Sequence, residues 1–313
     1  MDKRISTRDA YGAALVELGQ NNPKVVVLDA DLSKSTKTYD FSKQFPKRFF
    51  NMGIAEQNMM GTAAGLAASG KIAFASTFAV FATGRVYDQI RNSIAYTRLN
   101  VKICATHAGL TVGEDGASHQ SVEDIAMMRC LPNMTVFVPA DSTETRAAVL
   151  AAAEINGPVY IRLGRFEVPV LHNEQEFSFV PGQGITLRQG KDAVIIACGI
   201  MVGPALEAAE LLAKQGIEVQ VLDMPTIKPL DVEAIAQAAH TTGAVVTAEE
   251  HSIIGGLGGA IAEVLGEHYP VPLVRVGVQD TFGESGKPAE LLVKYGLTAQ
   301  DLVQAVHKVI SRK

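Results

Sequence analysis

Short apolar runs alternate with helix-forming stretches along almost the whole chain, and this alternation limits the possible folds more than any other feature. Runs rich in Val and Ile predict buried strands at 25–28, 72–75, 101–105, 135–138 and 159–163, and again at 194–197, 219–222, 244–247 and 273–276. Helical spacing between them predicts helices that include 54–68, 203–214, 231–239, 257–267 and 298–311. Such alternation predicts an α/β fold with two consecutive open, parallel or mostly parallel sheets, covered by helices on both faces.

The alternation stops at 166–184, a polar stretch with two prolines and no helical period. We interpret this stretch as a linker between a first domain, 1–165, and a second domain, 185–313. Open parallel sheets bind ligands beyond the carboxyl ends of their strands. We therefore expect the functional side chains in the loops that follow the predicted strands.

Charge and composition argue against several classes of partner. The formal net charge is -5 without long charged runs, so neither nucleic acid nor a membrane surface is expected as a partner. No apolar run approaches the roughly 20 residues of a membrane span, and the N-terminus does not resemble a signal peptide. Cys104, Cys130 and Cys198 are far apart and lie beside apolar residues. We expect three buried thiols in a cytoplasmic protein.

Glu56 is the first candidate functional residue. It lies in the segment NMGIAEQNMM, where a predicted strand ends at Asn51 and a helix begins near Ile54. A carboxylate in the first turn of a helix is favoured by the helix dipole, by about 0.3–1 kcal/mol. A lone Glu at this position is usually an ordinary surface acid. The small and apolar neighbours here predict instead that Glu56 is partly buried and requires a partner.

Two further segments carry side chains suited to binding. Phe78 and Phe81 are three residues apart at a predicted helix start, a spacing typical of core but also suited to a wall against a flat heterocycle. The long loop THAGLTVGEDGASHQSV contains His107, Asp115 and His119, and long ordered loops are often functional. The spacing of these three residues fits no standard zinc motif, so we predict no metal site.

Arg8, Ser35 and Arg165 form a scattered set, each near a predicted strand end or helix start. Two arginines that converge with a hydroxyl group would suit a phosphate. A single surface arginine is more often a solvated charge, and this is the alternative interpretation of Arg8 and Arg165.

Taken together, these segments resemble the pyrimidine-binding and C-terminal domains of transketolase. The resemblance covers essentially the whole chain. It is most specific in the stretches STRDAYG, LDADLSKST, GIAEQNM, STF, DQIR, HAGLTVGEDGASHQSVEDIAMMRCLPN, TIKPLD and SGKPAELL. The resemblance implies a thiamine-diphosphate enzyme that transfers a two-carbon ketol unit from a ketose phosphate to an aldose acceptor.

The resemblance also implies a partner chain. Transketolases hold the diphosphate through Mg²⁺ (or Ca²⁺) with a GDG motif followed by an Asn, and this sequence contains no such pair. A chain like this one looks like the C-terminal subunit of a split transketolase, which would need an N-terminal subunit carrying the diphosphate and metal site. The expected assembly is an α2β2 heterotetramer in which this chain also self-associates.

Individual roles follow from the same resemblance. Glu56 matches the glutamate that binds N1′ of the aminopyrimidine and sets the tautomer that accepts the thiazolium proton. Phe78 and Phe81 match ring-stacking positions. A third aromatic of many relatives falls here on Gly84 or Arg85, with one extra residue nearby, so Tyr87 is a candidate replacement.

The remaining matches concern the substrate and the subunit boundary. Asp115 matches a residue that binds the substrate hydroxyl next to the carbonyl, and His107 and His119 match donors to substrate oxygens. Asp31 matches a residue near the cofactor at the subunit boundary. The phosphate anchor matches the following residues: Arg8, Ser35, Arg165 and, in part, His119.

Other interpretations stay open at this point. The beta subunit of a 2-oxo acid dehydrogenase shares the architecture and the cofactor glutamate, and a 1-deoxyxylulose-phosphate-synthase-like enzyme is a second alternative. A non-catalytic regulatory subunit is the alternative from another class. The run IIGGLGGAI lacks the G-x-G-x-x-G spacing of a dinucleotide site, so we interpret it as a tight turn into a helix.

Overall fold

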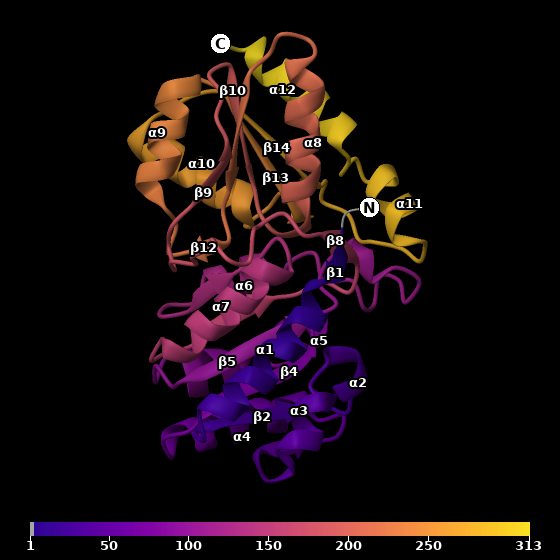
Figure 1. The fold of residues 1–313 in the computed structure, drawn as a ribbon, viewed down its shortest axis with the longest axis vertical. Coiled ribbons are helices and arrows are strands. Elements are labelled where there is room, and N and C mark those ends of the chain that lie inside the picture. The colour runs from indigo at the N-terminus through magenta and orange to yellow at the C-terminus, as the bar shows by residue number, and fades with distance from the viewer. Residues whose placement is uncertain (1–2) are drawn as a thin grey trace.

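The computed structural model describes residues 3–313, and its largest sheet has seven strands (Figure 1). Their order is β12-β6-β7-β5-β4-β2-β3, and every neighbouring pair is parallel except β12 with β6. This sheet occupies the lower half of Figure 1, apart from β12 at the junction between the two halves. Its strands are β2 (Val25–Asp29), β3 (Phe49–Asn51), β4 (Ile72–Phe78), β5 (Val101–Thr106), β6 (Thr135–Phe137), β7 (Val159–Arg162) and β12 (Thr226–Lys228).

Alternating side chains of the first sheet enter two different cores. Val25 and Val27 of β2 pack in one core, whereas Val26 and Leu28 pack in the other. Successive strand residues point to opposite faces, so an all-apolar strand is what a sheet covered on both sides requires. The helices of this half are α1 (Thr7–Asn21), α2 (Ser33–Thr36), α3 (Tyr39–Gln44), α4 (Glu56–Ala68), α5 (Ala79–Thr83), α6 (Asp124–Arg129) and α7 (Ser142–Glu154), with a π-helical segment at Gln89–Ala95.

The second sheet has five strands in the order β14-β13-β10-β11-β9, and only β9 runs antiparallel to its neighbour. Helices cover this sheet too, and the amphipathic α12 begins with a capping box between Thr298 and Asp301. The mostly parallel α/β fold predicted from the sequence is confirmed. The elements are β9 (Ile185–Arg188), β10 (Ala193–Ala197), β11 (Val219–Asp223), β13 (Val245–Ser252), β14 (Leu273–Val278), α8 (Val202–Ala213), α9 (Val232–Thr242), α10 (Leu257–His268), α11 (Pro288–Lys294) and α12 (Ala299–Ile310).

Two short strand pairs join parts of the chain that are distant in sequence. The polar stretch 166–184 is not a bare connection, because β8 (Glu167–Pro169) pairs antiparallel with β1 (Arg4–Ser6). In addition, β12 leaves the second half of the chain and extends the first sheet beside β6. Backbone pairing therefore joins the two halves at the junction seen in the middle of Figure 1.

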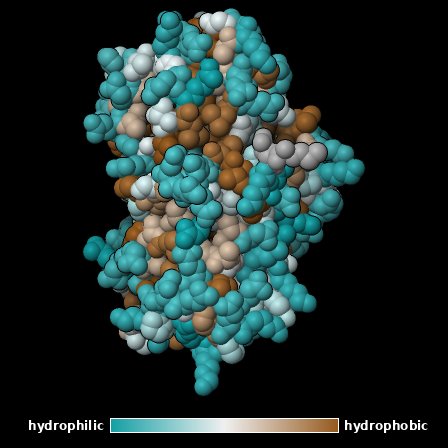
Figure 2. Space-filling view, viewed as in Figure 1, coloured by the Kyte–Doolittle hydropathy of each residue, from teal (hydrophilic) through white to brown (hydrophobic). Residues whose placement is uncertain are grey.

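The exposure of one cysteine differs from the sequence prediction. Cys104 and Cys198 are buried as predicted, but the prediction was wrong for Cys130, which is exposed at the end of α6. Within residues 3–313, no helix combines the length and apolar character that crossing a membrane requires. The face in Figure 2 is largely hydrophilic, with hydrophobic residues gathered in its upper half.

Candidate active site

Glu56 is the first residue of α4 and is 3% exposed. The helix begins two residues later than Ile54, the predicted start, and Gly53, with a φ of 68°, turns the chain between β3 and the helix. The buried carboxylate lies at the helix end where the partial charge is positive. Both parts of the prediction for Glu56, burial and a partner, agree with the structure.

The partner of Glu56 is Arg85, which the sequence analysis did not assign a role. One guanidinium nitrogen, Nη1, lies 2.8 Å from Glu56 Oε1, and the guanidinium carbon is 4.2 Å from the ring centre of Phe81. Tyr87, the candidate for the third aromatic, contacts Cys130 Sγ through its hydroxyl group at 3.2 Å. A cation thus stacks on one ring of the aromatic pair.

Four rings gather beyond the carboxyl ends of β4 and β5. The ring planes of Phe78 and Phe81 are nearly parallel, with an angle of 13° between them and ring centres 6.1 Å apart. His107 stacks on Phe78 at 3.8 Å, and His119 meets Phe81 edge-on at 5.4 Å. The predicted aromatic positions and the two histidines therefore form one cluster.

Arg8, Ser35 and Arg165 converge in one pocket of about 370 Å³, together with Phe78, His107 and Asp115. Arg8 Nη1 lies 3.1 Å from both the Ser35 carbonyl oxygen and His107 Nε2. Arg165 Nη1 lies 3.3 Å from Asp115 Oδ2. Lys34 also lines the pocket, and its place next to Ser35 in LDADLSKST is the signal that could have identified it.

Electrostatics in this pocket keep His107 neutral. Burial, followed by the positive charges of Arg8 and Arg165, lowers the pKa of His107 to about 3. Because Arg8 donates to Nε2, the neutral ring accepts there, and Nδ1 lies 2.9 Å from Thr106 Oγ1. The cationic character of the pocket thus comes from arginine and lysine rather than from histidine.

Asp31 lies apart from this pocket, on the loop that follows β2. Its backbone has a φ of 64°, and its carboxylate accepts a hydrogen bond of 2.9 Å from Asn51 Nδ2. The buried Asp29 holds the same loop through the backbone N–H of Leu32 and the hydroxyl groups of Thr36 and Thr38. The sequence reasoning missed this supporting role of Asp29.

The loop that carries Asp115 and His119 rests on the second half of the molecule. Glu250, at β13, accepts the N–H of Thr111 at 2.6 Å, and burial raises the pKa of Glu250 to about 7 against the charge of Arg162. Gln120 Nε2 donates to the carbonyl of Glu284, and Ser285 Oγ donates to that of Glu114. The second sheet and its loops therefore position one side of the candidate site.

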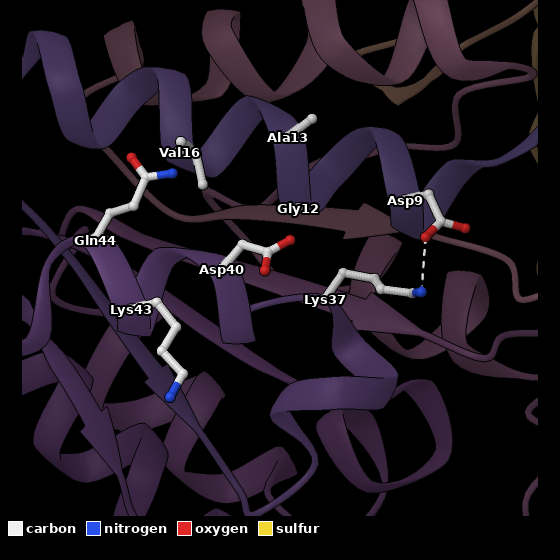
Figure 3. A pocket seen from close by; sticks show the side chains of 8 residues that line it. All are labelled: Asp9, Gly12, Ala13, Val16, Lys37, Asp40, Lys43 and Gln44. Atoms are coloured by element: carbon white, nitrogen blue, oxygen red, sulfur yellow. Dashed lines mark ion pairs between the residues drawn. The ribbon is translucent and has the colours of Figure 1, made fainter.

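Two other features fall outside the site. A pocket between α1 and α3 contains the ion pair of Asp9 and Lys37 but none of the predicted site residues (Figure 3). The run IIGGLGGAI turns into α10, where Glu249 accepts the N–H groups of Leu257 and Gly258 at 2.7 Å. A protein carboxylate thus occupies the helix end that a dinucleotide phosphate would need.

Comparison with known proteins gives two matching sequence families and many relatives. The family described as transketolase, pyrimidine binding domain matches residues 3–170, and transketolase, C-terminal domain matches residues 182–302. A putative transketolase C-terminal section from Methanocaldococcus jannaschii is 51% identical over 98% of this chain and 96% of that protein. A 6-deoxy-6-sulfo-D-fructose transketolase subunit from Clostridium sp. is 49% identical over 98% of this chain and 95% of that protein.

A longer relative and a relative of known structure point to the same family. The transketolase of Homo sapiens is 40% identical over 99% of this chain, which spans 50% of that protein. A solved split gene transketolase, described as an inactive beta4 tetramer, is 64% identical with a TM-score of 0.93 and covers 99% of both chains. The chain therefore belongs to the transketolase family.

Proposed function

We propose that this chain is one subunit of a two-chain, thiamine-diphosphate-dependent transketolase, and that Glu56 is its proton-handling carboxylate. The transferred unit is the two-carbon ketol group of a ketose phosphate, and the acceptor is an aldose. The observation that carries the proposal is a carboxylate 3% exposed at the first residue of α4, linked through Arg85 to a pair of parallel aromatic rings. Family membership supplies the reaction class.

The residues present fit an aminopyrimidine. Glu56 offers an acceptor in a site largely removed from water, and Arg85 connects it to Phe81, which with Phe78 offers flat apolar surface. When bound, thiamine diphosphate supplies the electron sink of the reaction. Glu56 holds a proton in a hydrogen bond to N1′, and a charge-assisted bond of this kind contributes about 1.5–3 kcal/mol. Asp31 lies toward the cofactor at the subunit boundary in this proposal.

A partner chain supplies the diphosphate site in this proposal. The sequence has no GDG motif followed by an Asn, so Mg²⁺ (or Ca²⁺) is assigned to an N-terminal subunit. Two relatives of nearly the same length are described as a C-terminal section and as a subunit, and the solved beta tetramer is described as inactive. We propose an α2β2 heterotetramer. Within this chain we assign 1–165 to pyrimidine binding, 166–184 to a linker and 185–313 to the C-terminal domain.

The convergent cations point to a phosphorylated sugar. Arg8 and Arg165 face one pocket with Lys34, and Ser35 adds polar atoms, a set suited to an anionic end group. Asp115 and His119 lie on the loop beside this pocket and are assigned to sugar hydroxyls and oxygens, as is His107. Relatives are described as acting on 6-deoxy-6-sulfo-D-fructose and on apulose 4-phosphate, so the anionic group of the donor varies within the family.

Replacement of Glu56 tests the proposed function. Glu56→Gln keeps the shape of the side chain but removes its basicity, so kcat of the assembled two-chain enzyme should fall by about 10²–10⁴-fold. The measurement is ketol transfer with the N-terminal partner, thiamine diphosphate and Mg²⁺. Glu154→Gln, at the end of α7, is the control and should retain full activity. A Glu56→Gln enzyme with near-normal kcat would remove Glu56 from the mechanism.

The phosphate anchor has a separate test. Arg165→Ala should raise KM for phosphorylated donors by about 10-fold or more, because a charge-assisted contact is lost, and should change kcat little. Kinetics with a phosphorylated and a non-phosphorylated donor measure this difference. An equal fall in kcat for both donors would contradict the anchor role.

A further inference from the structure

Three buried side chains from distant parts of the chain meet where the two halves of the molecule join. Glu144 comes from the first turn of α7, His172 from the segment after β8, and Asp223 from the end of β11. One ligand-type atom of each residue lies within 4.8 Å of those of the other two. Glu144 and Asp223 have no exposed surface, and His172 is 8% exposed.

The atoms that face one another in this cluster have no hydrogen-bond partner. Glu144 Oε1, His172 Nε2 and both carboxylate oxygens of Asp223 are buried and unpaired. The other Glu144 oxygen, Oε2, accepts the N–H of Ala140 at 2.6 Å. Unpaired buried acceptors are costly, and two neighbouring carboxylates without a counter-charge add mutual repulsion. A positive charge between them, from a protonated His172 or from a bound cation, would offset these costs.

A fourth residue orients the imidazole ring. His172 Nδ1 lies 3.2 Å from Asp141 Oδ2. The same carboxylate is fixed by the N–H groups of Leu171, His172 and Glu144 at 2.6–2.8 Å. A histidine that donates Nδ1–H to a carboxylate presents the lone pair of Nε2 on its other side. Histidine ligands of metal ions have this arrangement in most proteins.

We propose that Glu144, His172 and Asp223 bind a divalent transition-metal ion, with Zn²⁺ as the preferred ion. One imidazole nitrogen and carboxylate oxygens are suitable ligands for zinc, and bonds of about 2.1 Å place tetrahedral ligand atoms about 3.4 Å apart. The separation of His172 Nε2 and Asp223 Oδ2 is 3.5 Å. Neither Asp223 oxygen forms a hydrogen bond, so one of them can bind the ion together with His172 Nε2 and Glu144 Oε1.

The burial of the cluster gives this ion a structural role rather than a catalytic one. It would connect three parts of the chain: α7 in the first half, the segment that follows β8, and β11 in the second sheet. Binding of an ion only to the folded chain adds to stability by mass action. We therefore expect the ion to hold the two halves in their relative positions, independently of the proposed catalytic site.

Metal analysis of the full chain tests this inference. Untagged protein is stripped with EDTA, incubated with ZnSO₄, dialysed and measured by inductively coupled plasma mass spectrometry. Wild type should retain about one Zn²⁺ per chain, and its Tm should rise by several degrees relative to the stripped form. Co²⁺ in place of Zn²⁺ should give the visible absorption of tetrahedral cobalt. These three results on wild type decide the proposal even where a variant fails to fold.

Variants locate the ion. Glu144→Gln and His172→Gln should each weaken Zn²⁺ binding at least 100-fold, and Asp141→Asn should weaken it about 10–100-fold through the orientation of His172. His307→Gln, an exposed histidine on α12, is the control and should bind normally. Wild type that retains no Zn²⁺ overturns the proposal. A second result would also overturn it: the Tm of the stripped protein does not change when metal is added, and Glu144→Gln raises that Tm. Protons shared between the carboxylates, rather than a metal ion, would then balance their charges.

Discussion

Glu56 and Arg85 form an ion pair in which one partner is removed from water and the other is half exposed. The side chain of Arg85 is 45% exposed, whereas that of Glu56 is 3% exposed. Removal of Arg85 leaves a buried carboxylate without its cation, which costs more than loss of a surface pair. Arg85→Ala should lower the free energy of unfolding by about 1–3 kcal/mol, as measured by urea denaturation.

A double-mutant cycle separates this ion pair from the stacking of Arg85 on Phe81. In a Glu56→Gln background the cost of Arg85→Ala should fall to the few tenths of a kcal/mol left by lost packing. Arg91→Ala, an exposed arginine on the π-helical segment, should change stability little and serves as the control. Equal costs of Arg85→Ala in both backgrounds would show that the pair contributes nothing.

The burial of Glu56 was predictable from its neighbours, but the identity of its partner was not. Small and apolar residues around Glu56 indicate burial, and burial requires a counter-charge. The approach of Arg85 to Glu56 depends on the path of the backbone between α5 and the π-helical segment Gln89–Ala95. Such a segment alters which side chains share a face, and sequence spacing alone cannot show it.

At the scale of elements, the loop between β5 and α6 depends on close contact with β13. Gly109 has a φ of 80° and a ψ of -172°, and a Cβ atom there would overlap the carboxyl group of Glu250. Gly109→Ala must therefore strain the backbone and displace Glu250 from the N–H of Thr111. We expect a loss of about 1–3 kcal/mol in the free energy of unfolding, together with faster proteolysis of the loop.

Gly65 provides the matched control for this substitution. It lies in α4 with open space where a Cβ would be added, so Gly65→Ala should stabilise the chain by about 0.5–1 kcal/mol. Urea denaturation of both variants measures the change in the free energy of unfolding, which should be negative for Gly109→Ala and positive for Gly65→Ala. Equal or greater stability of Gly109→Ala would contradict the proposed contact between the loop and Glu250.

Elements formed by local pattern were predictable, whereas elements formed by distant pairing were not. The nine apolar runs all form strands, because burial on both faces of a sheet leaves a continuous apolar signal. By contrast, β8 and β12 are three residues each and exist through pairing with β1 and β6. The short helices α2, α3 and α11 are stabilised by their surroundings rather than by a long periodic pattern.

The whole molecule brings the candidate site together from both of its halves. Arg162 at the end of β7 is buried, lies 2.9 Å from Asp124, and donates to the carbonyl of Glu250 at 2.8 Å. The predicted pocket residues were identifiable one by one from their motifs. The support that the second half gives to the loop depends on this junction, which no periodicity in the sequence reveals.

At the scale of the whole molecule, we expect the proposed partner chain to bind near the start of α4. Ile54 is 80% exposed and lies two residues before the buried Glu56, at the entrance to α4. A cofactor shared between two chains must place the partner close to Glu56, so this isoleucine would become buried on assembly. Burial of an aliphatic side chain contributes about 1.5–3 kcal/mol, whereas a buried unpaired carboxylate is unfavourable.

Ile54→Glu should therefore weaken binding of the N-terminal partner by about 10-fold or more, since 1.4 kcal/mol corresponds to a factor of ten. Analytical ultracentrifugation or titration calorimetry with that partner measures the affinity. The stability of the isolated chain should not change, because Ile54 makes little contact within it. Val293→Glu is the control, since Val293 is 68% exposed on α11, far from α4 in Figure 1. Unchanged affinity of Ile54→Glu, or equal weakening by both variants, would place the partner on another surface and separate Glu56 from the subunit boundary.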